Sequence, residues 1–499
     1  MENQNYLKKA ASGTLFVFLF SVFGAIASYL LRFVLTSNLT PADYGLFYAC
    51  LSVIGLFALF NDFGLSGSLT YHISEFKANN KLKELKSSIY FVFFVHIIFA
   101  LIVTALIFTF SEFLAINYLH LSGDISKGIV VLKLLAITYF IQIGFSTFYG
   151  ILQGFQKMKT YAFAEFCRLL SWFGFTYLFI LLNFSYLSPA IGFLFSYIFV
   201  FILFSPSVLK LIPKVKLSFN KELSKKLILY GLPLMLSSAA GLVIGRTDTI
   251  LITFFLNLEQ VGIYQTAQPT ARLLWFFSGA FATVLFPLIV ELKTKKIKGL
   301  ENGISLIYRY IWITIIPLSL MAFSFSKELL NLFFGSFYAQ GSDVLKILAI
   351  GALFFSIVQI NGVIFNGLGK PKKYTKIIYI GATMNLIGNL ILIPIIGITG
   401  AAMSTLLTYI LMFLFSFVEL RKLIKIKIPF REWILTLFSG IISLLSIYLL
   451  KNLVITSNLI LKVILCFSMS IGLFIGLLIF LKVIDTKEIL NLAKQVIKK

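Results

Sequence analysis

The sequence has few charged residues, and this scarcity limits the kind of solvent in which the chain can fold. Asp, Glu, Lys and Arg together make up 12% of the 499 residues, whereas hydrophobic residues make up 59%. A soluble globular domain carries about 25% charged residues, because its surface faces water. The composition therefore excludes a soluble protein and predicts an all-α integral membrane chain.

Cysteine and histidine are also scarce. The cysteines are Cys50, Cys167 and Cys466, and the histidines are His72, His96 and His120. The cysteines lie far apart inside apolar runs without a Cys-x-x-Cys spacing, so a redox pair is excluded. The histidines are too few and too scattered for a metal cluster. We expect neither a metal nor a cofactor.

Acidic residues are outnumbered, with 19 Asp and Glu against 43 Lys and Arg, which gives a formal net charge of +24. Most of the basic residues lie in short gaps between apolar runs, where they set topology or meet anionic lipid headgroups. No basic domain remains outside the membrane to bind nucleic acid. We therefore expect membrane lipids, and no nucleic acid, as partners.

Long apolar runs are abundant. A helix needs about 20 mainly apolar residues to cross the hydrocarbon core, and fourteen runs meet this requirement. They cover 11–36, 45–71, 88–111, 128–153, 161–183, 187–209, 227–256, 262–290, 304–325, 344–368, 374–396, 398–419, 433–450 and 457–481.

Lysine and arginine alternate from gap to gap, which predicts the orientation. Basic residues gather in every second gap, for example at Lys77, Lys81, Lys83 and Lys86. The gaps 37–44, 183–186 and 257–261 contain none. Cytoplasmic loops keep positive charge, so both termini are predicted to be cytoplasmic in a multi-pass protein of the cell membrane.

Two pairs of gaps share a pattern at a nearly constant offset. The segment 39–47 resembles 256–264, with Leu, an acidic residue, Gly and an aromatic residue in common. The segment 154–161 resembles 367–374, with Gly, two Lys and Tyr in common. One such pair is expected by convergence of short loops, but two pairs indicate a parallel internal repeat. We predict an N-lobe of six helices at 1–212, a C-lobe of six helices at 213–424, and two extra helices with a cytoplasmic tail at 425–499.

Several short motifs resemble a known family. They are Leu39-x-Pro41-x-Asp43-Tyr44-Gly45-x-Phe47, Asp62-Phe63-Gly64-Leu65 within the second span, Gly231-x-Pro233, Asp248, Val261-Gly262-x-Tyr264 and Asn366-Gly367-x-Gly369-Lys370. Their order and spacing resemble the Wzx-type polysaccharide-biosynthesis flippases of the multidrug, oligosaccharidyl-lipid and polysaccharide exporter superfamily. The resemblance implies two six-helix lobes around a central cavity. It also implies export of a polyprenyl-diphosphate-linked glycan to the outer leaflet.

Charged residues inside the predicted spans are candidate site residues, because each costs about 2.5 to 3.5 kcal/mol near the bilayer centre. Arg32, Arg246, Asp248 and Arg272 fall in the outer half of the membrane, with three positive charges against one negative. An arginine fork can hold phosphate oxygens bidentately. These four residues are predicted to bind the substrate, and their excess of positive charge is predicted to attract its diphosphate, with snorkelling to the interface as the alternative for Arg32.

Two further features of the spans have structural alternatives. Asp62 lies in the inner half, where it is either an ion-coupling carboxylate or the partner of a nearby lysine. Glu165 and Arg168 share one helix face and are expected to neutralise each other. Arg246 and Asp248 lie two residues apart on one helix and cannot pair, so each needs a partner elsewhere.

The leading functional hypothesis is a flippase that moves a lipid-linked oligosaccharide by alternating access. A multidrug antiporter of the same superfamily requires a net negative cavity for cationic drugs, which the basic excess argues against. A membrane glycosyltransferase or polymerase requires a large loop and a polar cluster at a membrane face, and the sequence offers neither, so we do not expect an enzyme. Glycan-assembly proteins and a coupling cation are further candidate partners.

Overall fold

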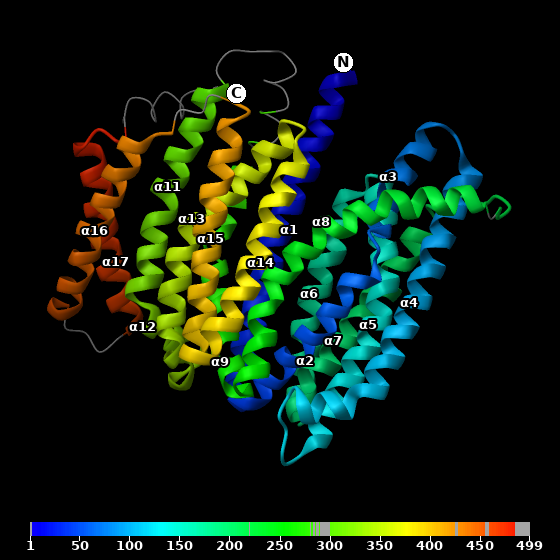
Figure 1. The fold of residues 1–499 in the computed structure, drawn as a ribbon, viewed down its shortest axis with the longest axis horizontal. Helices are drawn as coiled ribbons and strands as arrows, with labels where there is room; N and C mark the ends of the chain where they lie inside the picture. The colour runs from blue at the N-terminus through cyan, green and yellow to red at the C-terminus, as the bar shows by residue number, and fades with distance from the viewer. Residues whose placement is uncertain are drawn as a thin grey trace. The chain divides into compact units, whose positions relative to one another are not determined.

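The computed structural model describes residues 2–218, 220–279, 281–282, 285, 289, 300–424, 428–454 and 459–484. Within these residues every regular element is a helix, which confirms the all-α prediction (Figure 1). The first nine α-helices are α1 (Glu2–Asn38), α2 (Pro41–Asn61), α3 (Leu65–Ala78), α4 (Leu82–Asn117), α5 (Ile125–Gly154), α6 (Met158–Leu181), α7 (Ser188–Leu209), α8 (Lys221–Phe255) and α9 (Leu258–Arg272). The later ones are α11 (Leu300–Ser324), α12 (Ser326–Phe334), α13 (Ser342–Gly367), α14 (Pro371–Ile396), α15 (Ile398–Arg421), α16 (Phe430–Leu453) and α17 (Leu459–Phe480). Two short 3₁₀ turns, η1 (Ser185–Leu187) and η2 (Ser336–Gly341), precede α7 and α13.

Twelve of the described helices are long and apolar enough to cross a membrane, which confirms a multi-pass membrane protein. Twelve of the fourteen predicted spans correspond to these helices. The predicted span 262–290 begins in α9, which ends at Arg272, and part of its second half, from residue 280 onward, lies outside the described residues. The predicted span 45–71 is interrupted, as described below. The exact count of fourteen stays a prediction.

The chain separates into two compact units by its own contacts. The first unit comprises Met1–Thr266 and Asn385–Ala401, and the second comprises Ala267–Met384 and Ala402–Lys499. The predicted boundaries at 212 and 424 follow the repeat rather than contact density, and they stay a prediction. Each unit is described by itself.

The second predicted span is two helices rather than one. α2 ends at Asn61 and α3 begins at Leu65, so the motif predicted to lie within a continuous helix forms a break instead. Phe63 and Gly64 have positive φ angles of 42° and 68°, which end the α-helical ladder. The Asp62 side chain then stabilises the first turn of α3, because its Oδ1 accepts hydrogen bonds from the Ser66 amide at 2.9 Å and the Ser66 hydroxyl at 2.6 Å.

The break between α2 and α3 is in backbone contact with α8. A Cβ atom on Gly64 would overlap the backbone carbonyl of Gly231, and one on Gly231 would lie 2.6 Å from the Phe63 carbonyl oxygen. Two of the family motifs therefore meet backbone to backbone. α8 contains Pro233, which removes a backbone hydrogen bond and bends a helix, and Figure 1 shows α8 strongly bent.

The helix pairs of the first unit pack through aromatic residues. α4 packs against α5, α6 against α7, and α1 against α6 (Figure 1). Phe20 of α1 lies 5.5 Å from the rings of both Phe163 and Phe166 on α6. Trp172 of α6 lies 4.5 Å from Phe193 of α7. Such ring contacts are favourable beyond simple burial. They therefore stabilise the packing of α1 against α6 and of α6 against α7.

The second unit is built around a buried polar and aromatic cluster. The Tyr308 hydroxyl donates to Asn361 Oδ1 at 2.5 Å, and the Asn361 amide donates to Ser416 Oγ at 2.7 Å. Trp312 of α11 and Trp433 of α16 stack at 4.7 Å. The cluster joins α11, α13, α15 and α16, so the first of the two predicted extra helices is an integral part of the second unit.

Side-chain contacts recur at the offset of the predicted repeat. In one half, Arg32 donates to the Tyr48 hydroxyl at 2.9 Å. At positions 217 residues later, Gln265 donates to the Thr249 hydroxyl at 2.6 Å. Different residue types thus make the same helix-to-helix contact in each half, which supports the predicted repeat.

Candidate functional site

Arg246 lies in a gap that a glycine provides. Its Nη1 donates to the Leu51 carbonyl oxygen of α2 at 3.1 Å. The guanidinium covers Gly55, where a Cβ atom would overlap it. The side chain is half-buried. A larger residue at position 55 would therefore displace the Arg246 side chain.

Arg32 attaches to the same helix. Its Nη1 donates to the Tyr48 hydroxyl at 2.9 Å, and its guanidinium lies 4.8 Å from the centre of that ring. Tyr48 and Gly55 are seven residues apart, which places them on one face of α2 about 10 Å apart along the axis. The structure thus brings Arg32 and Arg246 to one face of α2, which we call the basic face (Arg32, Tyr48, Leu51, Gly55 and Arg246).

A third arginine nearby is neutralised by its own helix. Arg168 contacts both carboxylate oxygens of Glu165, with its Nε at 3.0 Å and its Nη2 at 2.5 Å, as the sequence spacing predicts. The Tyr149 hydroxyl also donates to Glu165 at 2.6 Å. The Arg168 guanidinium lies 5.1 Å from the Tyr197 ring, and Arg246 also interacts electrostatically with Tyr197. Tyr197 therefore lies close to both Arg246 of the basic face and Arg168 of the Glu165–Arg168 pair.

Asp248 is enclosed by neutral hydrogen-bond donors. Its side chain is fully buried. The Tyr264 hydroxyl of α9 donates to it at 2.5 Å, and the amides of Asn389 and Asn385 on α14 donate at 2.7 and 3.3 Å. These donors satisfy a buried carboxylate. The substrate-binding role of Asp248 stays a prediction, and in this conformation its carboxylate is shielded by these residues.

The sequence reasoning missed the two asparagines, because it searched the predicted spans only for ionisable residues. Asn385 and Asn389 are spaced i, i+4 in an apolar run, which places two polar amides on one face of α14. That pattern is the signal that could have identified them.

Asp62 has a histidine partner. His96 Nε2 of α4 lies 3.0 Å from Asp62 Oδ1. The other ring nitrogen, Nδ1, lies 2.7 Å from the Thr147 hydroxyl of α5. Of the two predicted alternatives, pairing with a lysine is therefore wrong for this conformation. His96 was overlooked because its partner lies 34 residues away in sequence.

Arg272 ends α9 and belongs to the second unit. Its guanidinium lies 5.5 Å from the centre of the Trp275 ring. The prediction that it binds substrate together with Arg246 stays a prediction.

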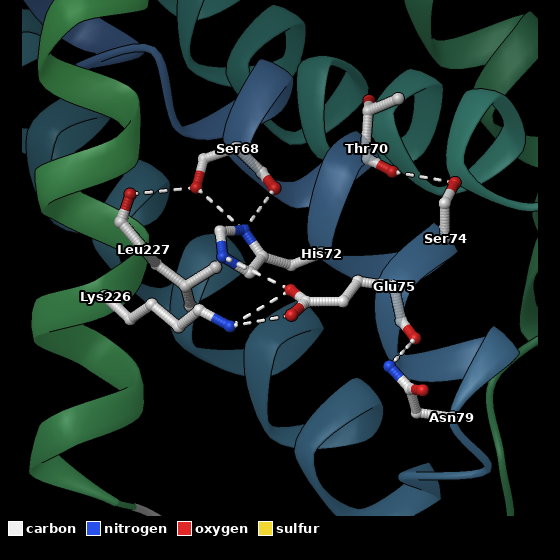
Figure 2. A network of polar contacts seen from close by, with 8 residues as sticks. All are labelled: Ser68, Thr70, His72, Ser74, Glu75, Asn79, Lys226 and Leu227. Atoms are coloured by element: carbon white, nitrogen blue, oxygen red, sulfur yellow. Dashed lines mark hydrogen bonds and ion pairs between the residues drawn. The ribbon is translucent and has the colours of Figure 1, made fainter.

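A polar network joins α3 to the first turns of α8 (Figure 2). The Ser68 hydroxyl donates to the Leu227 carbonyl at 2.8 Å, and Lys226 Nζ lies 3.0 Å from both carboxylate oxygens of Glu75. His72 Nδ1 lies 2.8 Å from the Ser68 carbonyl. Burial lowers the pKa of the His72 imidazole, so the ring is held neutral. The network fixes α8 to α3 near the predicted cytoplasmic end.

Comparison with known proteins identifies the family to which the chain belongs. The family model described as "Polysaccharide biosynthesis protein" matches residues 10–293. The chain belongs to this family. The resemblance inferred from the motifs is thereby confirmed, and it places the chain among the polysaccharide-biosynthesis flippases of the exporter superfamily.

Two relatives are similar to the chain along most of its length. An uncharacterised membrane protein of Methanocaldococcus jannaschii is 33% identical over 99% of this chain and 100% of its own. The probable low-salt glycan biosynthesis flippase of Haloferax volcanii is 25% identical over 94% of each chain. Among solved structures, the lipid II flippase MurJ in an inward closed conformation matches with a TM-score of 0.73 and 19% identity, over 92% of this chain and 99% of that one. The structural match shows that the fold is shared.

Proposed function

We propose that the chain moves a polyprenyl-diphosphate-linked oligosaccharide from the inner to the outer leaflet of the cell membrane by alternating access. The observation that carries the proposal is the basic face, where Arg32 and Arg246 reach the same side of α2 from two different helices. A diphosphate presents several anionic oxygens, and two guanidinium groups can bind it through charge-assisted hydrogen bonds.

The energetics favour a polar headgroup carried through the protein with the prenyl tail left in lipid. Moving a diphosphate through hydrocarbon without partners costs many kcal/mol. Arginines inside the membrane offset that cost while they attract the anion, and an apolar tail gains nothing by leaving the lipid.

The relatives support this assignment. The Haloferax volcanii relative is named a probable flippase of glycan biosynthesis, and the structural neighbour is a lipid II flippase. A multidrug antiporter for cations is disfavoured, because a cationic drug would be repelled by the arginines of the basic face.

The test follows flipping of a fluorescent, short-chain polyprenyl-diphosphate-linked disaccharide in reconstituted vesicles. Arg246→Gln removes charge-assisted contacts of the kind worth about 1.5 to 3 kcal/mol, so flipping should fall by about ten- to a hundredfold. Arg246→Lys keeps the charge without the fork and should restore flipping only in part.

Lys133 provides the matched control. It is a cation of α5 that lies 5.6 Å from the Phe108 ring, and the structure places it outside the basic face. Lys133→Gln should flip the probe at the wild-type rate. Normal flipping by Arg246→Gln at equal membrane abundance, or no flipping by the wild type, would contradict the proposed function.

A further inference from the structure

Asp62 and His96 are in contact, and their side chains differ in exposure. The Asp62 side chain is 40% exposed within the protein, whereas the His96 side chain is fully buried. Asp62 Oδ1 and His96 Nε2 lie 3.0 Å apart, and His96 Nδ1 lies 2.7 Å from the Thr147 hydroxyl. Asp62 is therefore the member of the pair with exposed surface, and His96 is the enclosed member.

The two contacts of the His96 ring define two protonation states of the Asp62–His96 pair. When the Thr147 hydroxyl donates to Nδ1, the neutral ring carries its proton on Nε2, the nitrogen that lies 3.0 Å from Asp62 Oδ1, and the pair has a net charge of −1. One added proton, on either the ring or the carboxylate, brings the net charge to zero. If the ring receives it, Nδ1 donates and the Thr147 hydroxyl turns to accept. A net charge inside the membrane is costly, which favours proton uptake whenever the site is closed to water.

Several other charged groups on the surrounding helices have partners elsewhere. The helices packed around the pair are α2, α3, α4, α5 and α8. Among the described residues, His96 is the charged group that acts appreciably on Asp62. Examples are Glu75 with Lys226, Asp43 with Lys127, Lys86 with the Val215 carbonyl, Lys133 with the Phe108 ring, and Arg246 with the Leu51 carbonyl. The protonation of the pair is thus set mainly by its own two members.

The pair lies where three helices meet. Asp62 closes α2 and holds the first turn of α3 through Ser66, and the same break rests on Gly231 of α8. α8 also carries Arg246 of the basic face. A change of charge on Asp62 therefore acts on the junction that connects α2, α3 and α8.

We propose that Asp62 and His96 form a proton-binding pair that couples proton movement to transport. The coupling rests on the proposed flippase function, whereas proton binding by the pair does not. In this account the pair takes up one proton in one access state and releases it in the other, with no other group consumed.

Proton binding is tested first, without substrate. Because the chain has three histidines, ring ¹⁵N spectra of the full-length protein in lipid nanodiscs should be assignable with His72→Gln, His96→Gln and His120→Gln variants. In a scan from about pH 5 to 8, the His96 signals should report uptake of the proton by the pair, and Asp62→Asn should alter them while leaving the His120 signals unchanged. A His96 signal that is constant across this range, or one that Asp62→Asn leaves unaltered, would overturn the proposal.

Coupling is tested with the fluorescent lipid-linked disaccharide in vesicles that carry a pH gradient of one unit. One-proton coupling allows a bias of up to about tenfold in the distribution of the probe between leaflets. Wild type and Lys133→Gln should show this bias, and Asp62→Asn and His96→Gln should lose it. A bias retained by both variants would overturn the coupling. If the wild type moves no probe while His96 still titrates as expected, the flippase proposal fails and the proton-binding pair stands.

Discussion

Gly45 and Gly262 face each other across the start of α2 and the start of α9. A Cβ atom on Gly45 would overlap the Leu258 carbonyl, and one on Gly262 would lie 2.7 Å from the Pro41 carbonyl oxygen. The contact is reciprocal, because Leu258 occupies the position of Pro41 and Gly262 that of Gly45, each 217 residues later. Glycine is required at both positions by this backbone approach rather than by an unusual φ angle.

We expect Gly45→Ala to separate the two helix starts. The added methyl has no room, and forcing a group into a packed contact costs about 1 to 3 kcal/mol. If the contact closes the predicted outer side, flipping of the lipid-linked disaccharide should fall several-fold. The same loss is expected for Gly262→Ala.

Gly174→Ala is the control for this prediction. Gly174 lies in α6, and a Cβ atom there would meet nothing within 4 Å. The variant should flip the probe normally and be as stable as the wild type. Normal flipping by Gly45→Ala and Gly262→Ala together would show that the contact is not part of the transport cycle.

Asp248 offers a second prediction, which separates a structural carboxylate from a substrate ligand. Asp248→Asn places an amide opposite two groups that donate to the native carboxylate, the Tyr264 hydroxyl and the Asn389 amide. A buried polar group without its partner costs about 1 to 3 kcal/mol. We therefore expect a lower melting temperature for the purified protein and less folded protein in the membrane.

A structural role and a substrate-binding role of Asp248 predict different measurements. A structural role lowers the amount of folded protein and leaves flipping per molecule close to the wild-type rate. A substrate-binding role lowers flipping per molecule at unchanged abundance. Unchanged abundance and unchanged flipping in Asp248→Asn would contradict both roles.

The orientation can be tested by labelling with a membrane-impermeant thiol reagent in intact cells. Cysteines introduced at Ser185 and Asn257, both exposed, should label from outside. A cysteine introduced at the exposed Lys157 should label only after the membrane is opened. The background requires removal of Cys50, Cys167 and Cys466, of which the first and last are buried. Labelling at position 157 in intact cells would contradict the predicted cytoplasmic N-terminus.

Patterns local in sequence predicted much of the fold. Most spans follow from runs of apolar residues, since lipid requires each span to satisfy its backbone hydrogen bonds internally. The Glu165–Arg168 pair was predicted for a similar reason, because residues three apart on a helix are neighbours wherever the helix packs. The repeat inferred from the motif pairs at offsets of 217 and 213 stays a prediction, although similar contacts occur at the two segments of the second pair. Gly154 packs against Ile73, and Gly367 packs against Ile289.

The partners of the buried charges were decided by tertiary structure alone. Asp248 is held by residues from α9 and α14, and Asp62 by His96 of α4, which no local spacing relates to them. The break after α2 is of the same kind. Gly64 permits a break in the run 45–71, but a glycine alone does not require one, and it is the close approach of the α8 backbone that leaves no room for a side chain there. The sequence by itself determined which segments lie in lipid, because burial in lipid depends on composition along a single helix. Only the packing of distant helices decided where their charges are neutralised, because a charge inside the membrane is stabilised by whichever polar groups the neighbouring helices bring to it.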